Sequence, residues 1–280
     1  MFTKKSSLIG CALLAAGISG AFAADWSDTY IGWRYGNKFA EPFNKNDISK
    51  NIFNLGHVSG YKYGTNFLNV DMLLSDSNDS MNGNSGAHET YVVYRHTLDF
   101  GKILGNPETF KWGPIRGVGF TAGFDYNSKT GDSYQSKKRM LVAGPTVMLD
   151  VPGFLNISVL QLWESNAPRT HPDRYYYDPH PMLTAAWGIP IGSLPLSFEG
   201  YANYIAAKGQ NEFGGGTKPE TNIDAMVMYD ASSLVGAKAK TFRVGLEYQY
   251  WRNKFGNDHK GAAGDGAFAK TPMIRAEYHF

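Results

Sequence analysis

The sequence predicts an all-β protein: a 12-stranded antiparallel transmembrane β-barrel of the bacterial outer membrane. Three observations lead to this prediction. The N-terminus reads as an export signal, twelve segments alternate between apolar and polar residues, and the last segment ends on an aromatic residue. Barrels of this kind have an even number of strands, an apolar outer face and a polar lumen.

The first 23 residues have the form of a secretory signal peptide. Lys4 and Lys5 give a positive start, a short apolar stretch follows over 8–18, and Ala-Phe-Ala at 21–23 supplies a small-residue cleavage site. The stretch is too short to span a bilayer as a helix. We expect cleavage after Ala23, which leaves 24–280 as a single β-barrel domain.

Removal of the signal peptide leaves a neutral chain without cysteine. It takes away two lysines and Cys11, the one cysteine, so 27 − 2 = 25 basic residues face 25 acidic residues. Disulfides and cysteine nucleophiles are therefore not expected. Neutrality argues against nucleic acid as a partner. The histidines show no metal-ligand spacing, and we expect neither a metal nor another cofactor.

Twelve segments alternate with a period of two, which places their apolar and polar sets on opposite faces of a strand. In 241–252, for example, Val244 and Leu246 share one face and Glu247 lies on the other. Only for the segment 137–150 does the sequence leave undecided which residues face the lumen and which face outward. The segments are 28–37, 52–61, 66–75, 88–100, 116–126, 137–150, 154–164, 180–189, 194–207, 222–231, 241–252 and 272–280.

The predicted connections alternate in length. Those after the odd-numbered strands are mostly long and polar, whereas those after the second, sixth, eighth and tenth are short, and the one after the fourth is the exception. An outer-membrane barrel sorts its loops in this way, with the long loops outside the cell and both termini in the periplasm. A secreted β-sandwich, the alternative fold, has no reason to do so.

The closing segment 272–280 carries an apolar face of Pro272, Ile274, Ala276, Tyr278 and Phe280. A terminal Phe with an aromatic residue two positions earlier resembles the C-terminal signal that the barrel-assembly machinery reads in bacterial outer-membrane proteins. We expect this strand to pair with 28–37 and to show its aromatic face to lipid.

The inner face of the predicted barrel carries both signs of charge together with aromatic and amide side chains. Two interpretations are open. In the first, charge pairs on adjacent strands only neutralise one another inside a crowded lumen. In the second, these charges and the aromatic rings bind a neutral, hydrogen-bonding solute. Twelve strands leave a bore suited to a selective channel rather than a general porin. We expect the charges of 275 and 277 to join those of 34, 243 and 247 in one patch. The candidate solute-binding residues are Arg34, Asp71, Glu89, Tyr91, Arg95, Asp125, Glu199, Tyr201, Asn203, Asp224, Arg243, Glu247, Arg275 and Glu277.

Catalysis is not expected. His57 and Ser59 share a face of the second strand, as a Ser–His pair of an outer-membrane phospholipase would, but no supporting acid accompanies them.

Several segments resemble the OmpK-like branch of the nucleoside-specific channel (Tsx-type) family. They are DWSD at 25–28, FAEPFN at 39–44, ISKNI at 48–52, HVSGYKYGTNF at 57–67 and YVVYRHTL at 91–98. The resemblance implies a 12-stranded outer-membrane barrel that passes nucleosides, with relatives that serve as bacteriophage or colicin receptors through their outer loops. Two functions therefore stay open: a channel for nucleosides or similar small neutral solutes, and a surface receptor or adhesin displayed on a barrel with no dedicated transport role.

Overall fold

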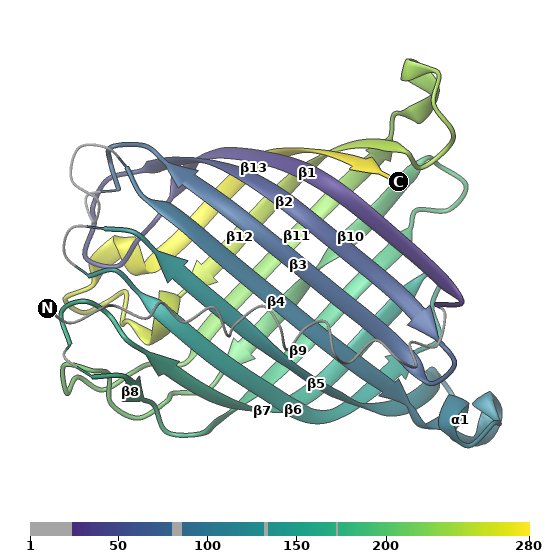
Figure 1. Ribbon diagram of the computed structural model, residues 1–280, viewed down its shortest axis with the longest axis horizontal. Coiled ribbons are helices and arrows are strands. Elements are labelled where there is room, and N and C mark those ends of the chain that lie inside the picture. Colours follow the sequence, from purple (N-terminus) through teal and green to yellow (C-terminus); the bar gives the residue numbers. More distant parts are fainter. Residues whose placement is uncertain (1–23, 80–85, 132–133, 172) are drawn as a thin grey trace, which may run out of the picture.

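The computed structural model describes residues 24–79, 86–131, 134–171 and 173–280. The predicted signal peptide lies outside these residues, as does 80–85 of the loop after the third strand. Within them, thirteen strands form one antiparallel sheet in the order β6-β5-β4-β3-β2-β1-β13-β12-β11-β10-β9-β7-β8, and β6 also pairs with β7. The short strand β8 (Tyr175–Tyr176) pairs only with the end of β7, so 13 − 1 = 12 strands close the barrel (Figure 1). The predicted 12-stranded antiparallel barrel is confirmed.

Each barrel strand contains most of one predicted segment. The largest differences lie at the starts of β2 and β13, which begin at Ile48 and Phe268, 52 − 48 = 4 and 272 − 268 = 4 residues before the predicted segments, because the alternation of buried and exposed residues continues there. The strands are β1 (Trp26–Phe39), β2 (Ile48–Tyr61), β3 (Gly64–Ser75), β4 (His88–Asp99), β5 (Ile115–Lys129), β6 (Lys137–Leu149), β7 (Phe154–Asn166), β9 (His180–Pro190), β10 (Leu196–Ile205), β11 (Glu220–Asp230), β12 (Phe242–Arg252) and β13 (Phe268–His279).

The first and last strands close the barrel as predicted. Ile31 pairs with Tyr278 and Tyr35 pairs with Ile274 across the β1–β13 seam. The start of β1 and the end of β13 lie at the same end of the barrel, with the short turns, and the longer loops gather at the opposite end, called here the long-loop end (Figure 1).

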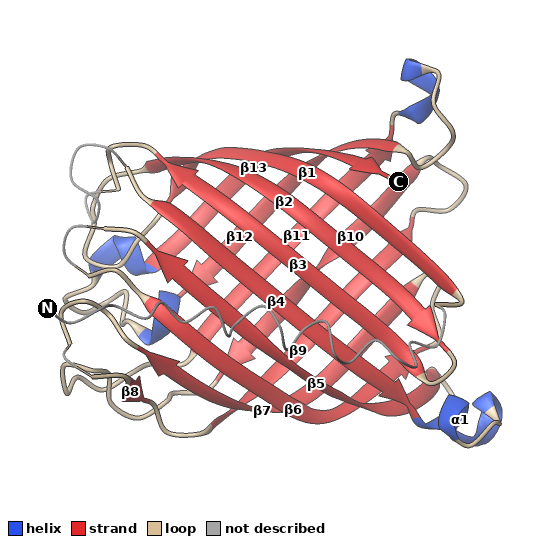
Figure 2. Ribbon diagram, in the orientation of Figure 1, coloured by secondary structure: helices blue, strands red, loops and turns tan. Residues whose placement is uncertain are grey.

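Short helices interrupt connections at both ends (Figure 2). The long connection after β4 contains α1 (Phe100–Ile103) and η2 (Pro107–Phe110). The connection after β11, predicted to be a short turn, instead runs over 231–241 and contains η3 (Ser232–Val235), so that prediction is wrong. At the long-loop end lie η4 (Lys254–Gly256) and η5 (Gly264–Ala267). No helix in the described parts of the chain is both long and apolar enough to cross a membrane.

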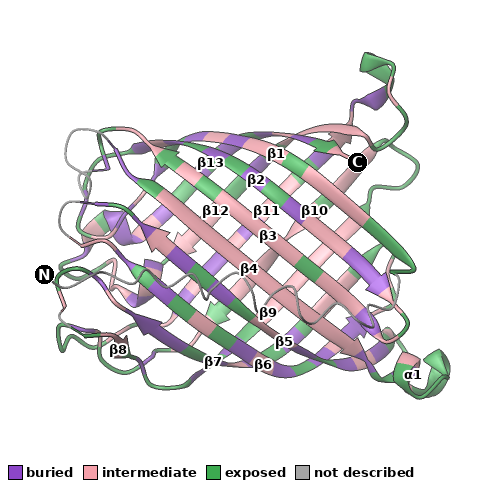
Figure 3. Cartoon of the chain, viewed as in Figure 1, coloured by how far each residue is buried: buried purple, intermediate pink, exposed green. Residues whose placement is uncertain are grey.

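The outer surface is apolar, and the interior contains many buried charges beside two small apolar clusters, unlike the interior of a water-soluble protein. Leu246 and Leu141 are 70% and 60% exposed, whereas the lumenal Glu247 and Glu277 are each 3% exposed. Exposed and buried residues alternate along several strands (Figure 3). Leu141 also settles the facing of β6, since it points outward while Val142 is buried.

Exposed aromatic side chains ring the barrel near both ends, with aliphatic residues between them. Such belts mark the two membrane interfaces of a transmembrane barrel. The belt near the short-turn end includes Phe120, Phe154, Phe198 and Tyr278, the belt near the long-loop end includes Tyr126, Trp163, Tyr204 and Tyr248, and Val159, Leu183 and Ile274 lie between.

Glycine lets one aromatic ring lie flat against the lumen wall. Tyr30 and Gly56 are register partners on β1 and β2. A Cβ at Gly56 would lie 2.1 Å from the Tyr30 ring, so no larger residue fits there unless the ring moves. The glycine therefore makes room for an inward-facing tyrosine in a narrow barrel.

Candidate functional site

Ion pairs join the first and last strands on the lumenal side. Glu247 on β12 accepts hydrogen bonds from Arg34 Nη1 on β1 and from Arg275 Nη1 on β13, at 2.9 Å each. Arg34 Nη2 also lies 2.6 Å from Asp71 Oδ2 on β3, and Arg275 Nε donates to Glu277 Oε1 at 2.6 Å. Five candidates from four strands therefore form one chain of charges, called here the seam network.

The seam network continues onto β10. Arg243 on β12 lies 3.4 Å from Glu277 Oε2 and forms an ion pair with Glu199 on β10. The predicted patch of charges at 34, 243, 247, 275 and 277 is confirmed as a spatial cluster. A separate lumenal group lies on β4 and β5, where Arg95 pairs with Asp125 and Tyr91 Oη donates to Asp125 Oδ2 at 3.0 Å.

Solvent exposure divides the candidate residues into two groups. One group is buried: Arg34, Asp224, Glu247, Arg275 and Glu277 lie in or beside the seam network, and Asp125 lies apart from it and pairs with Arg95. The other group is partly exposed within the lumen: Asp71, Glu89, Tyr91, Arg95, Glu199, Tyr201, Asn203 and Arg243. The buried group fits the interpretation of mutual neutralisation, and only the second group is positioned to contact a passing solute.

Unused hydrogen-bond acceptors lie beside this accessible surface. Tyr201 on β10 is the register partner of Asp224 on β11. Asp224 Oδ2 accepts a bond of 3.3 Å from Gln249 Nε2 on β12, and the Asp224 carboxyl also lies within hydrogen-bonding reach of Glu247. The side-chain oxygens of Asn222 and Asn156 are buried without a partner among the described residues. Water or the donors of a solute would satisfy these acceptors.

A second set of charges, not predicted from the sequence, fills the barrel at the long-loop end. Glu41 Oε1 lies 2.8 Å from Lys50 Nζ, 3.2 Å from Lys254 Nζ and 3.5 Å from Lys129 Nζ. Burial by itself would raise the pKa of Glu41, but the ammonium groups of Lys129, Lys254 and Lys50 outweigh it and hold that pKa well below its ordinary value. We call these four residues the Glu41 cluster.

A neighbouring cluster ties other loops to the barrel wall. Lys208, in the connection after β10, lies 2.7 Å from Glu164 on β7 and 3.7 Å from Glu220 on β11. Burial would lower the pKa of Lys208, but the two carboxylates raise it. Glu212 in the same connection accepts hydrogen bonds from Tyr134 and Tyr177. The loops are therefore pinned across the mouth by buried, paired charges.

The other sequence-based expectations concern catalysis and metals. His57 Nδ1 lies 2.8 Å from Thr29 Oγ1, whereas Ser59 is near Asn66, whose amide is 3.5 Å from its hydroxyl. In the part of the chain that the structure describes, no group of His, Cys, Asp and Glu side chains is arranged to hold a metal ion. The absence of catalysis stays a prediction.

No family model matches the sequence, and no curated protein matches it. Solved structures similar to this chain include the translocator domain of the autotransporter NalP from Neisseria meningitidis, with 11% identity over 91% of this chain and 88% of that one and a TM-score of 0.41. The NanC porin is 10% identical to this chain, over 90% of this chain and 99% of the porin, with a TM-score of 0.41. A loop-deletion variant of OmpT from Vibrio cholerae is 10% identical to this chain, over 91% of this chain and 99% of the OmpT variant, with a TM-score of 0.38.

The protein's own architecture defines its class. Twelve strands form a closed antiparallel barrel within the described residues, with an apolar outer surface, aromatic belts near both ends and charged residues in the lumen. These features together define a transmembrane β-barrel of the outer-membrane type.

Proposed function

We propose that this protein is a channel of the bacterial outer membrane through which nucleosides or similar small neutral solutes diffuse. Its long loops face the outside of the cell and both ends of the mature chain lie in the periplasm. The partly exposed lumenal surface of mixed charges and tyrosines on β4, β10 and β12 is the observation that supports this proposal most strongly.

The lining suits a neutral solute better than an ion. Arg95 is balanced by Asp125 and Arg243 by Glu199, so neither sign of charge prevails along the accessible surface. A channel selective for ions would need a ring of one sign.

The same surface offers the groups that a nucleoside needs. Tyr91 and Tyr201 present partly exposed rings, and stacking a base on an aromatic side chain contributes about 1–3 kcal/mol. Asn203 is partly exposed, and its side-chain amide is available for a hydrogen bond with a base or sugar. The resemblance to the nucleoside-specific channels supports this choice of solute.

Uptake into vesicles tests this proposal. Vesicles containing the protein should admit adenosine several times faster than a sugar alcohol of similar size. Tyr201→Ala should reduce that preference by a factor of roughly 5–100, the equivalent of one stacked ring. The matched control is Tyr204→Ala, because Tyr204 lies on the same strand but faces outward and is 53% exposed. Equal uptake of both solutes by the unmodified protein would contradict the proposal.

A receptor function is a second candidate, because the long-loop end exposes large aromatic side chains. Phe43, Tyr176 and Phe213 are 69%, 73% and 64% exposed, and all three lie outside the twelve strands of the barrel. Exposed aromatic residues often form the centre of protein interfaces. If a phage or colicin binds here, Phe43→Ser with Phe213→Ser should reduce its adsorption without changing solute uptake.

A further inference from the structure

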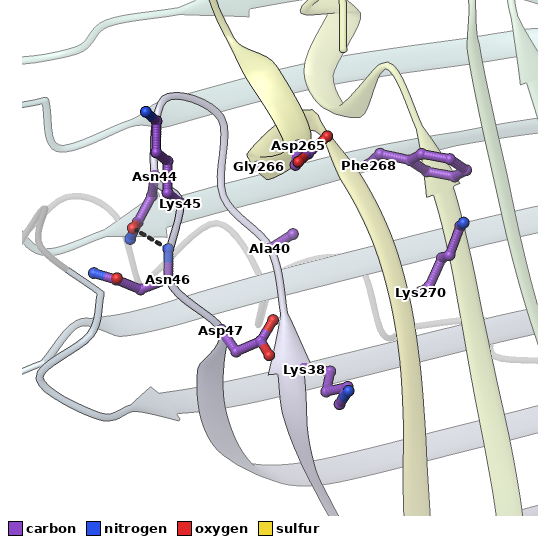
Figure 4. A pocket seen from close by; sticks show the side chains of 10 residues that line it. All are labelled: Lys38, Ala40, Asn44, Lys45, Asn46, Asp47, Asp265, Gly266, Phe268 and Lys270. Carbon is purple, nitrogen blue, oxygen red and sulfur yellow. Dashed lines mark hydrogen bonds between the residues drawn. The ribbon is translucent and has the colours of Figure 1, made fainter. Parts of the chain in front are cut away.

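A cavity of about 250 Å³ opens at the long-loop end beside the β1–β13 seam, outside the lumen. Figure 4 shows its two walls, the chain between β1 and β2 on one side and the start of β13 with η5 on the other. Lys38 and Lys270 belong to the outer face, because their neighbours Phe39, Ala269 and Thr271 are buried on the lumenal side. The lining residues are Lys38, Ala40, Asn44, Lys45, Asn46, Asp47, Asp265, Gly266, Phe268 and Lys270.

Hydrogen bonds hold the first wall in place. Asn44 Oδ1 accepts the Asn46 N–H at 3.0 Å (Figure 4), and Asn44 Nδ2 donates to the carbonyl of Asn78 at 2.7 Å. The N–H of Phe43 donates to the carbonyl of Ala263 at 3.0 Å, which ties this wall to the segment before β13. The cavity is therefore a preformed part of the fold.

The cavity holds lysines without counter-ions, in contrast to the lumen. Lys38, Lys45 and Lys270 are exposed and form no ion pair with any described residue, whereas Lys50 and Lys208 are buried and paired. Lys38 and Lys270 lie on adjacent strands, since Thr271 Oγ1 donates to the carbonyl of Lys38 at 2.8 Å. The two lysines therefore place two unpaired positive charges at neighbouring strand positions, and a bound anion would neutralise them.

The other lining groups suit a sugar. Asp47 and Asp265 are exposed and also lack an ion pair within the described chain, so their carboxylates are available to accept hydrogen bonds from hydroxyls. Phe268 offers an apolar ring, with Lys270 Nζ 4.5 Å from its centre. Three lysines against two aspartates leave a net positive charge for a phosphate.

The cavity lies at the level of lipid headgroups. Tyr248, in the aromatic belt near the long-loop end, is the register partner of Pro272 on β13, and Lys270 lies two residues further toward the long-loop end. At about 3.3 Å per residue and a strand tilt of about 40°, Lys270 lies roughly 5 Å beyond that belt. The headgroup layer of a bilayer is of the same order, about 5–8 Å on each side.

We propose that this cavity binds the phosphorylated sugar headgroup of a lipid in the outer leaflet. The phosphate lies between Lys38 and Lys270, the sugar hydroxyls donate to Asp47 and Asp265, and the ring of the sugar packs on Phe268. The proposal depends on the orientation of the barrel in the membrane and not on the solute that it passes.

Native mass spectrometry of the full-length mature protein in detergent tests this site. The probes are a bis-phosphorylated glucosamine-disaccharide lipid, the same lipid without phosphates, and free glucosamine 1-phosphate. The phosphorylated lipid should bind, and Lys38→Gln with Lys270→Gln should weaken its binding about 30-fold, because each lysine near an anionic headgroup contributes a factor of about five. The control pair is Lys238→Gln with Lys240→Gln, two exposed lysines at the opposite end of the barrel.

Each outcome decides the proposal. Loss of the phosphorylated lipid only in the Lys38 and Lys270 variant supports it. Equal binding of the dephosphorylated lipid, or equal weakening by the control pair, overturns it. If free glucosamine 1-phosphate binds as tightly as the lipid, the site takes a soluble sugar phosphate, and the assignment to a lipid is wrong. Solute uptake by both variants should match the unmodified protein, so failure here is distinct from failure of the channel proposal.

Discussion

Arg34 and Arg275 are directly opposed register partners across the seam where β1 and β13 close the barrel. Two guanidinium groups at such positions repel each other. Glu247 resolves this conflict by placing one carboxylate oxygen 2.9 Å from each arginine, and it is 3% exposed. The closure of the barrel therefore depends on a carboxylate from the neighbouring strand β12.

Glu247→Gln should destabilise the barrel strongly. The substitution keeps the shape of the side chain but leaves two buried arginines without their shared counter-ion, and breaking a buried ion pair costs about 3–5 kcal/mol. Urea unfolding in detergent measures the loss. Glu199→Gln is the control: its side chain is 26% exposed, so removing its ion pair with Arg243 should cost about 1 kcal/mol or less. If Glu247→Gln costs no more than Glu199→Gln, Glu247 does not hold the seam closed.

Deletion of Phe280 should reduce assembly without much change in the stability of the folded barrel. The side chain is 73% exposed and its ring contacts only Tyr278 among the described aromatic residues, although its N–H donates to Thr29. We expect its main role to be recognition by the barrel-assembly machinery. The yield of folded protein in the outer membrane should fall, while the chain refolded in detergent should unfold at nearly the same urea concentration. A large drop in that concentration would assign Phe280 a structural role.

Opening of the loops should be insensitive to pH from 7 down to about 4. The pKa of Glu41 is lowered in the closed state, so its ionised form stabilises closure above the ordinary carboxyl pKa of about 4.3, and this stabilisation is lost as pH falls through the lower pKa of the closed state. Single-channel conductance should therefore rise only in strongly acidic solution. Glu41→Gln leaves Lys254 without an ion pair among the described residues and Lys50 and Lys129 with only Glu89 and Asp79, and it should raise conductance several-fold already at pH 7. A conductance unaffected by this substitution would contradict a gating role for the Glu41 cluster.

Gly56→Ala should destabilise the barrel by about 1–3 kcal/mol, because the new methyl group would overlap the Tyr30 ring. Adding Tyr30→Leu should recover much of this loss, and denaturant unfolding of the two single variants and the double variant measures the coupling. Gly216→Ala is the control, since nothing lies within 4 Å of a Cβ built there. Additive effects of the changes at 30 and 56 would argue against this packing.

The strands were predictable because membrane and lumen impose opposite polarity on alternate residues. The alternation of Val244 and Leu246 with Glu247 is enough to place each side chain on its face. The prediction fell short where Lys270 interrupts the apolar stripe of the last strand, since a lysine at the headgroup level does not distinguish strand from loop. The 231–241 connection also resembled a turn, because its small residues carry no pattern of their own.

The sequence predicted which residues form the seam network, but not whether these residues contact a solute or only neutralise one another. The alternation along the strands identified Arg275, Glu277 and Glu247 as facing the lumen. Burial and ion-pair geometry, which the alternation does not give, decide which charges a solute can reach. The Glu41 cluster was missed because Glu41 and Lys254 lie in loops, where no periodicity fixes direction. Lys50 and Lys129 do occupy inward-facing strand positions. Extending the alternation of β2 and β5 to the ends of these strands could have found them.

The current through single channels in a planar bilayer tests the central proposal most directly. A nucleoside such as adenosine, added at millimolar concentration, should block this current in a concentration-dependent manner. A sugar of similar size should leave the current nearly unchanged, since it lacks an aromatic face to stack on Tyr91 and Tyr201. A steady current with no block at millimolar nucleoside, or equal block by the sugar, would contradict the assignment of this barrel as a nucleoside-selective channel.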